Sequence, residues 1–341
     1  MPRSSFRCAH NWQMRVASGH VCLILLSIAT AGFDVVAASH ARGQVRPSGD
    51  ALPVPDAIPI ESNHQYSVSG AVRPFLVFWI SRENVGGARI TRRRMADGTL
   101  GLELLTGSDP MRAPFHTNRW GYIREIVRAD EEELIAVKSE TAEETIDEAR
   151  ANVNNGDKSR LLVFIREKVT AKEAVAWSTV ADVGREVTYR DLPYVLNRMA
   201  SLDNWQQRRL VRPANVRPGY LTAFNELMNA TVQAVTAGEH SRSKRFPGPL
   251  VYIHRAKLYD LIQDQVEVLA RFDRGAHGQI PAVRARFRIR SHETGSTSGE
   301  YVVVYGLQGD LAAVPIRMTY QPRWWLRTEL ALNESADFAS Q

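Results

Sequence analysis

Apolar runs between residues 74 and 169, and a largely alternating or β-rich pattern from residue 250 to residue 332, predict β-strands. The apolar runs are short, and they are rich in β-branched and aromatic residues. From residue 250 onward, Gly, Asp, Pro or Ser interrupts the pattern every roughly 10 to 16 residues, which favours antiparallel meander strands over a parallel sheet with crossover helices. The predicted strands cover residues 74–81, 87–95, 99–106, 118–127, 161–169, 249–262, 264–272, 282–291, 300–308, 312–321 and 323–332.

Turn and helix signals lie between these strands. Asp97-Gly98 separates two apolar runs and predicts a tight hairpin, because both residues tolerate the positive φ that such a turn requires. A capping-box pattern predicts a short helix over 141–153. A second helix is expected to begin near 191–193, and the longest covers about 218–237, where Gly238 follows as a stop signal.

Together these elements predict an α+β fold. We expect a large, curved antiparallel sheet, similar to a half-barrel meander, with a few helices packed on one of its faces. The helices fall mainly within an insert at about 188–238. The expected organisation is a signal peptide at 1–31 (cleaved at 31 or as late as 41), a Pro/Gly/Ser-rich tether at 42–73, the sheet domain at 74–332 and a tail at 333–341.

The N-terminus has the pattern of a secretory signal peptide. A basic segment leads into an apolar run and then into Ala29-Thr30-Ala31, a small-x-small cleavage pattern. A retained membrane anchor is the alternative, but Asp34 interrupts the run before the roughly 20 apolar residues needed to cross a bilayer. We therefore expect a periplasmic or extracellular protein.

Cysteine content and charge narrow the classes of function. Cys8 and Cys22 both lie in the expected signal peptide, so the mature chain has no thiol for a disulfide, a metal ion or a nucleophile. The formal net charge of +6 includes three arginines of that segment and becomes +3 without them. This excess is too small to indicate nucleic-acid binding.

Motifs for catalysis, metal binding and cofactor binding are absent from the sequence. There is no nucleophile elbow, no phosphate-binding loop and no His-Glu-x-x-His pattern, so we assign no catalytic residue, metal ligand or cofactor. His254 lies in a predicted strand, and we interpret it as a hydrogen-bonded sheet residue. Two carboxylates from distant strands could still meet as a hydrolytic pair, but the sequence does not identify them.

Aromatic residues provide one set of candidate binding residues. Trp120 and Tyr122 are two positions apart in a predicted strand and therefore share one face of the sheet. They could line a ligand cleft or belong to the core. Trp324 and Trp325 are adjacent and must point to opposite faces, so one is expected in the core while the other needs a cover, a cavity or a partner.

Arginines provide the second set. Arg284, Arg286, Arg288 and Arg290 alternate with apolar residues, so a strand places all four on one face about 6.7 Å apart. We call them the arginine row. They could bind phosphate or carboxylate groups of a ligand or an envelope partner. The other interpretation is a solvated face whose arginines pair with acidic residues such as Glu267 and Glu300.

Three segments carry a resemblance to known proteins: residues 75–90, 106–125 and 314–332. In these segments the chain resembles a family of uncharacterised exported bacterial proteins, and the resemblance implies no activity. The expected sheet with helices against it also looks like the half-barrel fold of periplasmic lipoprotein carriers. That likeness concerns architecture alone.

Two functions follow as hypotheses, and whether the protein is an enzyme stays open. The first is a non-enzymatic envelope or periplasmic module that binds or carries an amphipathic or anionic ligand, or docks on an envelope partner, with membrane contact at the surface only. The second is a periplasmic hydrolase whose site is assembled from distant residues; it predicts two close carboxylates, or a Ser-His contact, with a perturbed pKa.

Overall fold

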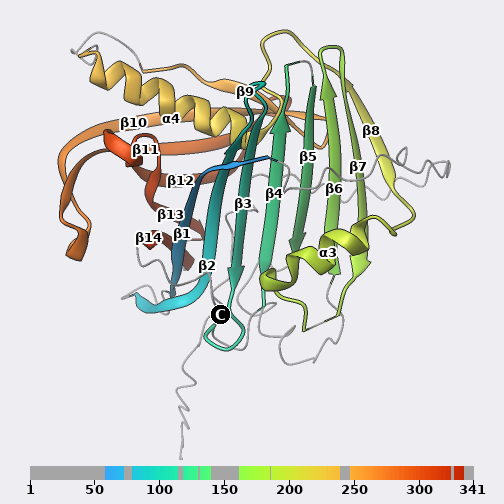
Figure 1. The fold of residues 1–341 in the computed structure, drawn as a ribbon, viewed down its shortest axis with the longest axis horizontal. Helices are drawn as coiled ribbons and strands as arrows, with labels where there is room; N and C mark the ends of the chain where they lie inside the picture. Colours follow the sequence, from blue (N-terminus) through green and yellow to red (C-terminus); the bar gives the residue numbers. More distant parts are fainter. Residues whose placement is uncertain are drawn as a thin grey trace, which may run out of the picture.

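The computed structural model describes residues 58–72, 79–113, 118–129, 131–139, 161–184, 186–238, 246–323 and 326–333 (Figure 1). The strands are β1 (Ile60–Val72), β2 (Ile80–Arg94), β3 (Leu100–Ser108), β4 (Trp120–Val127), β5 (Glu131–Ser139), β6 (Leu161–Thr170), β7 (Glu173–Asp182), β8 (Gln206–Val211), β9 (Leu250–His254), β10 (Lys257–Asp273), β11 (Gln279–Ser291), β12 (Thr297–Gly306), β13 (Pro315–Arg323) and β14 (Leu326–Asn333). The helices are α3 (Leu192–Met199) and α4 (Tyr220–Thr236), with short 3-10 helices η4 (Tyr189–Asp191), η5 (Gly275–His277) and η6 (Gly309–Leu311).

All fourteen strands belong to one antiparallel sheet. Its order is β8-β7-β6-β5-β4-β3-β2-β1-β14-β13-β12-β11-β10-β9, so β1 to β8 form one meander and β9 to β14 form another. The two meanders join where β1 pairs with β14. The antiparallel meander predicted from the rhythm of turn residues is therefore confirmed.

The fold class predicted from the sequence is wrong in its helical part. The described residues contain two α-helices of 8 and 17 residues beside fourteen strands, so the fold is nearly all-β and not α+β. Strands β1, β5, β7 and β8 were not predicted as separate strands, and part of the expected helical insert forms β8. The helix expected over 141–153 lies outside the described residues.

Local signals in the sequence account for the confirmed turns and helices. At the β2–β3 turn, Gly98 has a φ of +88°, and the backbone N–H of Thr99 donates to a carboxylate oxygen of Asp97 at 2.8 Å. Pro193 stands in the first turn of α3, where its missing N–H is not needed. Gly238 ends α4 with a φ of +72°, as its left-handed conformation permits.

The two helices pack on opposite faces of the sheet, which corrects the prediction of one covered face. Leu227 and Met228 of α4 share a buried cluster with Ile123 of β4. Val195 of α3 shares another with Tyr122, the neighbour of Ile123 on the same strand. Successive residues of a strand point to opposite sides, so α4 lies on one face, here called the inner face, and α3 lies on the outer face.

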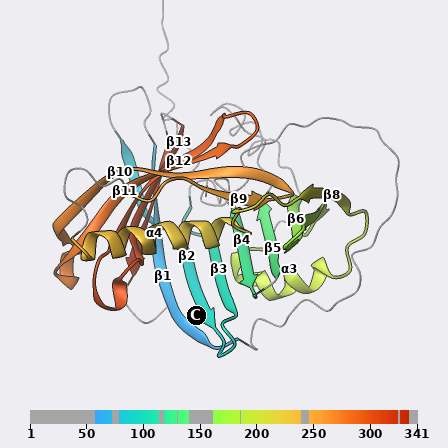
Figure 2. The same ribbon diagram turned by 90° about the horizontal axis from the view of Figure 1, so that it is seen from above.

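The sheet curls until its two ends meet. The carboxylate of Glu167 on β6 accepts hydrogen bonds from the backbone N–H groups of Arg255 at 2.9 Å and Ala256 at 2.7 Å, in the turn between β9 and β10. Arg217, which follows β8, exchanges backbone hydrogen bonds of 2.7 and 3.1 Å with β9. Figures 1 and 2 show β9 returning to the strands β4 to β6.

The expected domain organisation is described only in part. The tether predicted over 42–73 extends too far, because residues 60–72 form β1, a central strand of the sheet. Prolines are concentrated before residue 60, and the strand begins directly after Pro59. The expected signal peptide and residues 334–341 of the expected tail lie outside the described residues. Within the described ranges, no helix is both long and apolar enough to span a bilayer.

Candidate functional site

The structure places the arginine row on the outer face of β11. Phe287 and Ile289, which alternate with the arginines, are fully buried on the inner face. Each arginine has an acidic neighbour: Arg284 with Glu267 at 3.7 Å, Arg286 with Glu300 at 3.4 Å, Arg288 with Asp264, and Arg290 with Asp260 at 2.7 Å. The pairs with Glu267 and Glu300 that the sequence suggested are both present. A binding role for the row stays a prediction, and it would act from the outer face.

The predicted aromatic residues divide between the core and the undescribed part of the chain. Trp120 and Tyr122 share one face of β4 as predicted, and both are buried beside α3. The hydroxyl of Tyr122 donates to Glu103 at 3.3 Å. This packing fits the core interpretation of the pair. Trp324 and Trp325 lie outside the described residues.

Three buried glutamates on the inner face form the most unusual polar group in the structure. Glu125 on β4 and Glu167 on β6 are both register partners of Leu134, on the intervening strand β5. Glu132 lies two residues before Leu134 and therefore on the same face. The three side chains, here called the carboxylate cluster, are 0%, 1% and 2% exposed for Glu125, Glu132 and Glu167.

Two of these glutamates hold other elements against the sheet. Glu125 accepts hydrogen bonds at the start of α4 from the backbone N–H groups of Leu221 and Thr222, both at 2.7 Å, and from the Thr222 hydroxyl at 2.8 Å. These N–H groups have no partner within the helix, so the carboxylate acts as a cap supplied by another strand. Glu167 plays the same role for the β9–β10 turn.

Glu132 differs from both, because neither of its carboxyl oxygens has a hydrogen-bond partner among the described residues. It is close to Glu125: a Cβ atom added to Gly219 would lie 2.5 Å from an oxygen of each residue, so the two oxygens are at most twice that distance apart. Only a glycine can occupy position 219, because any side chain there would clash with these two carboxyl groups. Two carboxylates this close cannot both ionise easily.

Burial raises the pKa of all three groups. The pKa of Glu125 rises to about 7, although hydrogen bonds from the start of α4 oppose the shift. Burial likewise raises the pKa of Glu167 to about 7 against the donors of the β9–β10 turn. For Glu132, burial and then the neighbouring carboxylates of Glu125 and Glu167 raise the pKa well above its usual range. Glu132 is therefore the member that keeps its proton at neutral pH.

Other unpartnered polar atoms line the same interior. Within the described part of the chain, the Tyr252 hydroxyl and both ring nitrogens of His254 have no hydrogen-bond partner, although both side chains are fully buried on β9. Burial, with the positive charges of Arg255 and Lys138, lowers the pKa of His254 to about 3. His254 is in a strand as predicted, but the hydrogen bonding expected for it is not observed.

Aromatic rings surround these polar atoms. Tyr220 at the start of α4 lies 5.7 Å from Tyr252 and 5.8 Å from Phe224, measured between ring centroids. Phe224 in turn lies 5.0 Å from Phe287, and the hydroxyls of Tyr220 and Tyr301 are 2.6 Å apart. The inner face therefore combines a broad aromatic surface with isolated polar groups. No group of His, Cys, Asp or Glu in the described ranges could hold a metal ion.

The carboxylate cluster was not predicted from the sequence, although the sequence contains a signal for it. Glu125 follows Ile123 at the inward-facing spacing of β4, and Glu132 precedes Leu134 and Ala136 at the same spacing on β5. A glutamate in the apolar phase of a strand indicates a buried charge with a specific purpose. Which of these positions meet depends on strand register, which the sequence does not specify.

Comparisons with known proteins establish no family. No family model matches the chain, and no curated protein matches it. Among solved structures, the chain is similar to a β-barrel-like protein from Brucella abortus, described as a domain of unknown function, DUF1849. The two are 8% identical, with a TM-score of 0.31, over 81% of this chain and 96% of the other. The resemblance to exported bacterial proteins stays a prediction.

Proposed function

We propose that this protein is an exported, non-enzymatic binding or carrier-like module that holds an amphipathic ligand between α4 and the inner face of the sheet. The observation that carries the proposal is the set of unpartnered polar atoms within an aromatic interior, at Tyr252, His254 and Glu132. An apolar ligand body would lie against the aromatic rings, and a polar group of the ligand would pair with these atoms.

The energy of unpaired polar groups supports this proposal. Nearly all buried polar groups in native proteins have a hydrogen-bond partner, and an unpaired one costs about 1 to 3 kcal/mol. The Tyr252 hydroxyl and the His254 ring are each 0% exposed, so neither reaches bulk solvent in this conformation. A ligand that supplies a donor or an acceptor there would recover part of that cost when it binds.

The way α4 is attached gives a ligand a means of entry. The strands are joined by ladders of backbone hydrogen bonds, whereas α4 is held by packing and by single side-chain contacts. These include the Glu125 cap and the hydrogen bond of 3.1 Å between Thr231 and Gln263. Displacement of α4 would expose the aromatic inner face without breaking a strand pair. Figure 2 shows α4 between the strands β1 to β3 on one side and β9 to β11 on the other.

Mass spectrometry of protein purified without detergent from a bacterial periplasm tests the proposal. We expect a stoichiometric adduct under native conditions that is lost on denaturation. Tyr252→Phe removes only the unpaired hydroxyl and should reduce the adduct, whereas Tyr66→Phe, which removes a hydroxyl paired with the Pro315 carbonyl at 2.9 Å, should retain it. If no adduct is found and neither dodecyl maltoside nor a charged amphiphile such as dodecyl phosphate binds to the purified protein, the proposal is wrong.

A hydrolase is the second candidate, and the carboxylate cluster is the observation that favours it. Retaining glycosidases use two carboxyl groups about 5 to 5.5 Å apart, one with a raised pKa, and the close approach of Glu125 and Glu132 is similar. However, both residues are buried beneath the start of α4, and three donors already occupy Glu125. Hydrolysis of aryl glycosides by the wild type, abolished in Glu132→Gln while that variant stays folded, would favour this alternative.

A further inference from the structure

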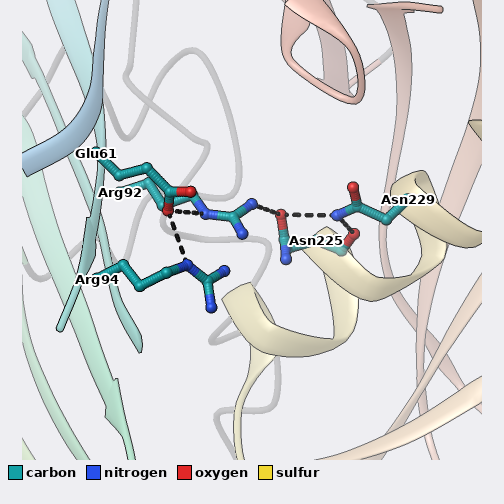
Figure 3. Close-up of polar contacts among 5 residues, drawn as sticks. All are labelled: Glu61, Arg92, Arg94, Asn225 and Asn229. Atoms are coloured by element: carbon teal, nitrogen blue, oxygen red, sulfur yellow. Dashed lines mark hydrogen bonds and ion pairs between the residues drawn. The ribbon is translucent and has the colours of Figure 1, made fainter. Parts of the chain in front are cut away.

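A pair of inward-facing arginines lies at the end of β2, outside the site described above. Arg92, Arg93 and Arg94 are consecutive, so alternation sends Arg93 to one face and the other two to the opposite face. Arg93 pairs with Glu103 at 2.9 Å. Arg92 reaches Asn225 of α4 at 3.5 Å, which places Arg92 and Arg94 on the inner face beside the helix (Figure 3).

The two guanidinium groups share one carboxylate. A single oxygen of Glu61 accepts from Nε of Arg92 at 2.7 Å and from Nε of Arg94 at 3.2 Å. This leaves one excess positive charge, whereas each member of the arginine row has its own acidic partner. Glu61 is the only partner of the Arg94 guanidinium among the described residues, so the two terminal nitrogens of Arg94 remain available. The Arg94 side chain is 43% exposed, so a ligand can reach it.

Helix α4 adds neutral polar groups on the facing side. The side-chain oxygen of Asn225 accepts from Arg92 and also from the amide of Asn229 at 3.1 Å (Figure 3). The Asn229 amide also donates to the backbone carbonyl of Asn225 at 2.7 Å, and this bond fixes the orientation of the Asn229 side chain. Neither amide neutralises the excess charge, and no acidic residue other than Glu61 pairs with Arg92 or Arg94 among the described residues.

Apolar residues lead from these arginines into the aromatic interior. Leu100 is the register partner of Arg94, and Ile90 precedes Arg92 on the same face of β2. Val232 follows Asn229 by three positions and therefore lies on the same side of α4. All three are partly buried and pack against the core cluster that includes Phe224 and Phe287. A charged group at the arginines would thus connect directly with an apolar surface.

A histidine lies deeper on this path. His64 is the register partner of Ile90, and its Nε2 is buried without a hydrogen-bond partner in the described part of the chain. Burial lowers the pKa of His64, so the ring is neutral near pH 7 and can donate or accept one hydrogen bond. It offers a second polar contact behind the arginines.

We propose that Arg92 and Arg94 bind the anionic head, a phosphate or carboxylate, of the amphipathic ligand whose apolar part lies between α4 and the sheet. The planar fork of arginine suits these oxygens, and the available nitrogens of Arg94 provide a two-point contact. Glu61 holds the two side chains in place before the ligand arrives. The inference rests on the proposed function, because it specifies the charge and the position of the ligand head.

Binding of four probes by isothermal titration calorimetry tests this inference. The probes are dodecyl phosphate, dodecanoate and dodecyl maltoside, each below its micelle-forming concentration, and inorganic phosphate. We expect the wild type to bind the two anionic amphiphiles about ten-fold or more tighter than dodecyl maltoside, since hydrogen bonds to charged groups are the strong ones. Arg92→Gln plus Arg94→Gln should remove this preference and leave dodecyl maltoside binding unchanged.

Two further variants make the result decisive. Arg94→Gln alone changes the more exposed arginine and should lose most of the preference, so a folding defect in the double variant does not prevent the test. Arg284→Gln plus Arg286→Gln removes the same amount of charge from the outer face. This variant should keep the preference for anionic amphiphiles. The inference is overturned if the wild type binds charged and neutral amphiphiles equally, if inorganic phosphate binds as tightly as dodecyl phosphate, or if the outer variant loses the preference. Failure of every amphiphile to bind would instead overturn the proposed function.

Discussion

Replacing Glu132 by glutamine should stabilise the protein at neutral pH, although the side chain is buried. Glutamine has nearly the same shape as a protonated glutamate but carries no titratable proton. In the native state Glu132 is 1% exposed, and its oxygens have no partner among the described residues. Burial together with Glu125 and Glu167 raises its pKa well above the usual range. The wild type must therefore keep a proton there that the unfolded chain releases.

Proton linkage gives the sign and the size of the effect. A carboxyl group with a raised folded pKa binds more protons in the folded state, so stability falls as pH rises from its unfolded pKa toward its folded pKa. The unfolded value is 4.5. At pH 7.5, three units higher, retention of the proton costs up to about 4 kcal/mol, and at pH 5 it costs less than about 1 kcal/mol. Glu132→Gln removes this cost.

Urea denaturation at pH 5 and pH 7.5 measures the difference. We expect Glu132→Gln and the wild type to have similar free energies of unfolding at pH 5, and the variant to be more stable by about 2 to 4 kcal/mol at pH 7.5. Comparing the two proteins at each pH cancels the other titrating groups. Glu131→Gln, at the neighbouring position, is a matched control that should change the stability in the opposite direction.

Glu131 is on the other face of β5 and accepts from Lys168 at 2.9 Å. The hydrogen bond and the charge of Lys168 lower its pKa. The control should therefore lose about 0 to 1 kcal/mol of stability at pH 7.5. If Glu132→Gln is less stable than the wild type at pH 7.5, Glu132 is ionised and paired in the native protein. If the difference in stability does not change with pH, folding does not raise the pKa of Glu132.

Three other predictions follow from buried contacts. Between pH 7 and pH 5 the wild type should lose about 2 kcal/mol more stability than His254→Gln. Burial lowers the pKa of His254 to about 3 in the folded protein, whereas this histidine gains a proton near pH 6.5 in the unfolded chain. An equal loss in the two proteins, measured by urea denaturation, would contradict this prediction. Without ligand, Tyr252→Phe should leave the melting temperature unchanged or higher, whereas Tyr66→Phe breaks a buried hydrogen bond and should lose about 1 to 3 kcal/mol, and equal losses would refute the distinction. Gly107→Ala should lose about 1 to 3 kcal/mol in the same assay, because its Cβ would lie 2.2 Å from the Tyr189 ring, and a neutral result would contradict this packing.

Much of the local structure could be predicted because it depends on neighbouring residues. Asp97-Gly98 produces its hairpin through the φ that glycine permits, and α4 ends where Gly238 provides a left-handed residue. The prediction failed at β1, whose polar residues Ser62, Asn63 and Gln65 do not show the apolar content of an ordinary strand. Pairing with β2 on one side and β14 on the other makes this segment a strand.

The candidate site was less accessible to sequence analysis. Arg284 and its row were selected by their periodicity, and the structure finds them paired on the outer face. The carboxylate cluster was not selected, because Glu132 is 7 residues from Glu125 and 35 residues from Glu167 in the sequence. Only the register of strands β4, β5 and β6 brings the three side chains together. The pair Arg92 and Arg94 is distinguished from Arg93 only by which of them faces α4.

The sequence alone determined the antiparallel meander, most of its strands and the positions of both helices. These features follow from side-chain periodicity and from backbone preferences of single residues, which act over a few positions. Only the tertiary structure decided that the two ends of the sheet meet, that α4 and α3 cover opposite faces, and that Glu132 is buried without a partner among the described residues. The charge state of a side chain depends on its exposure to solvent and on its neighbours in space. Both are determined only when the chain folds.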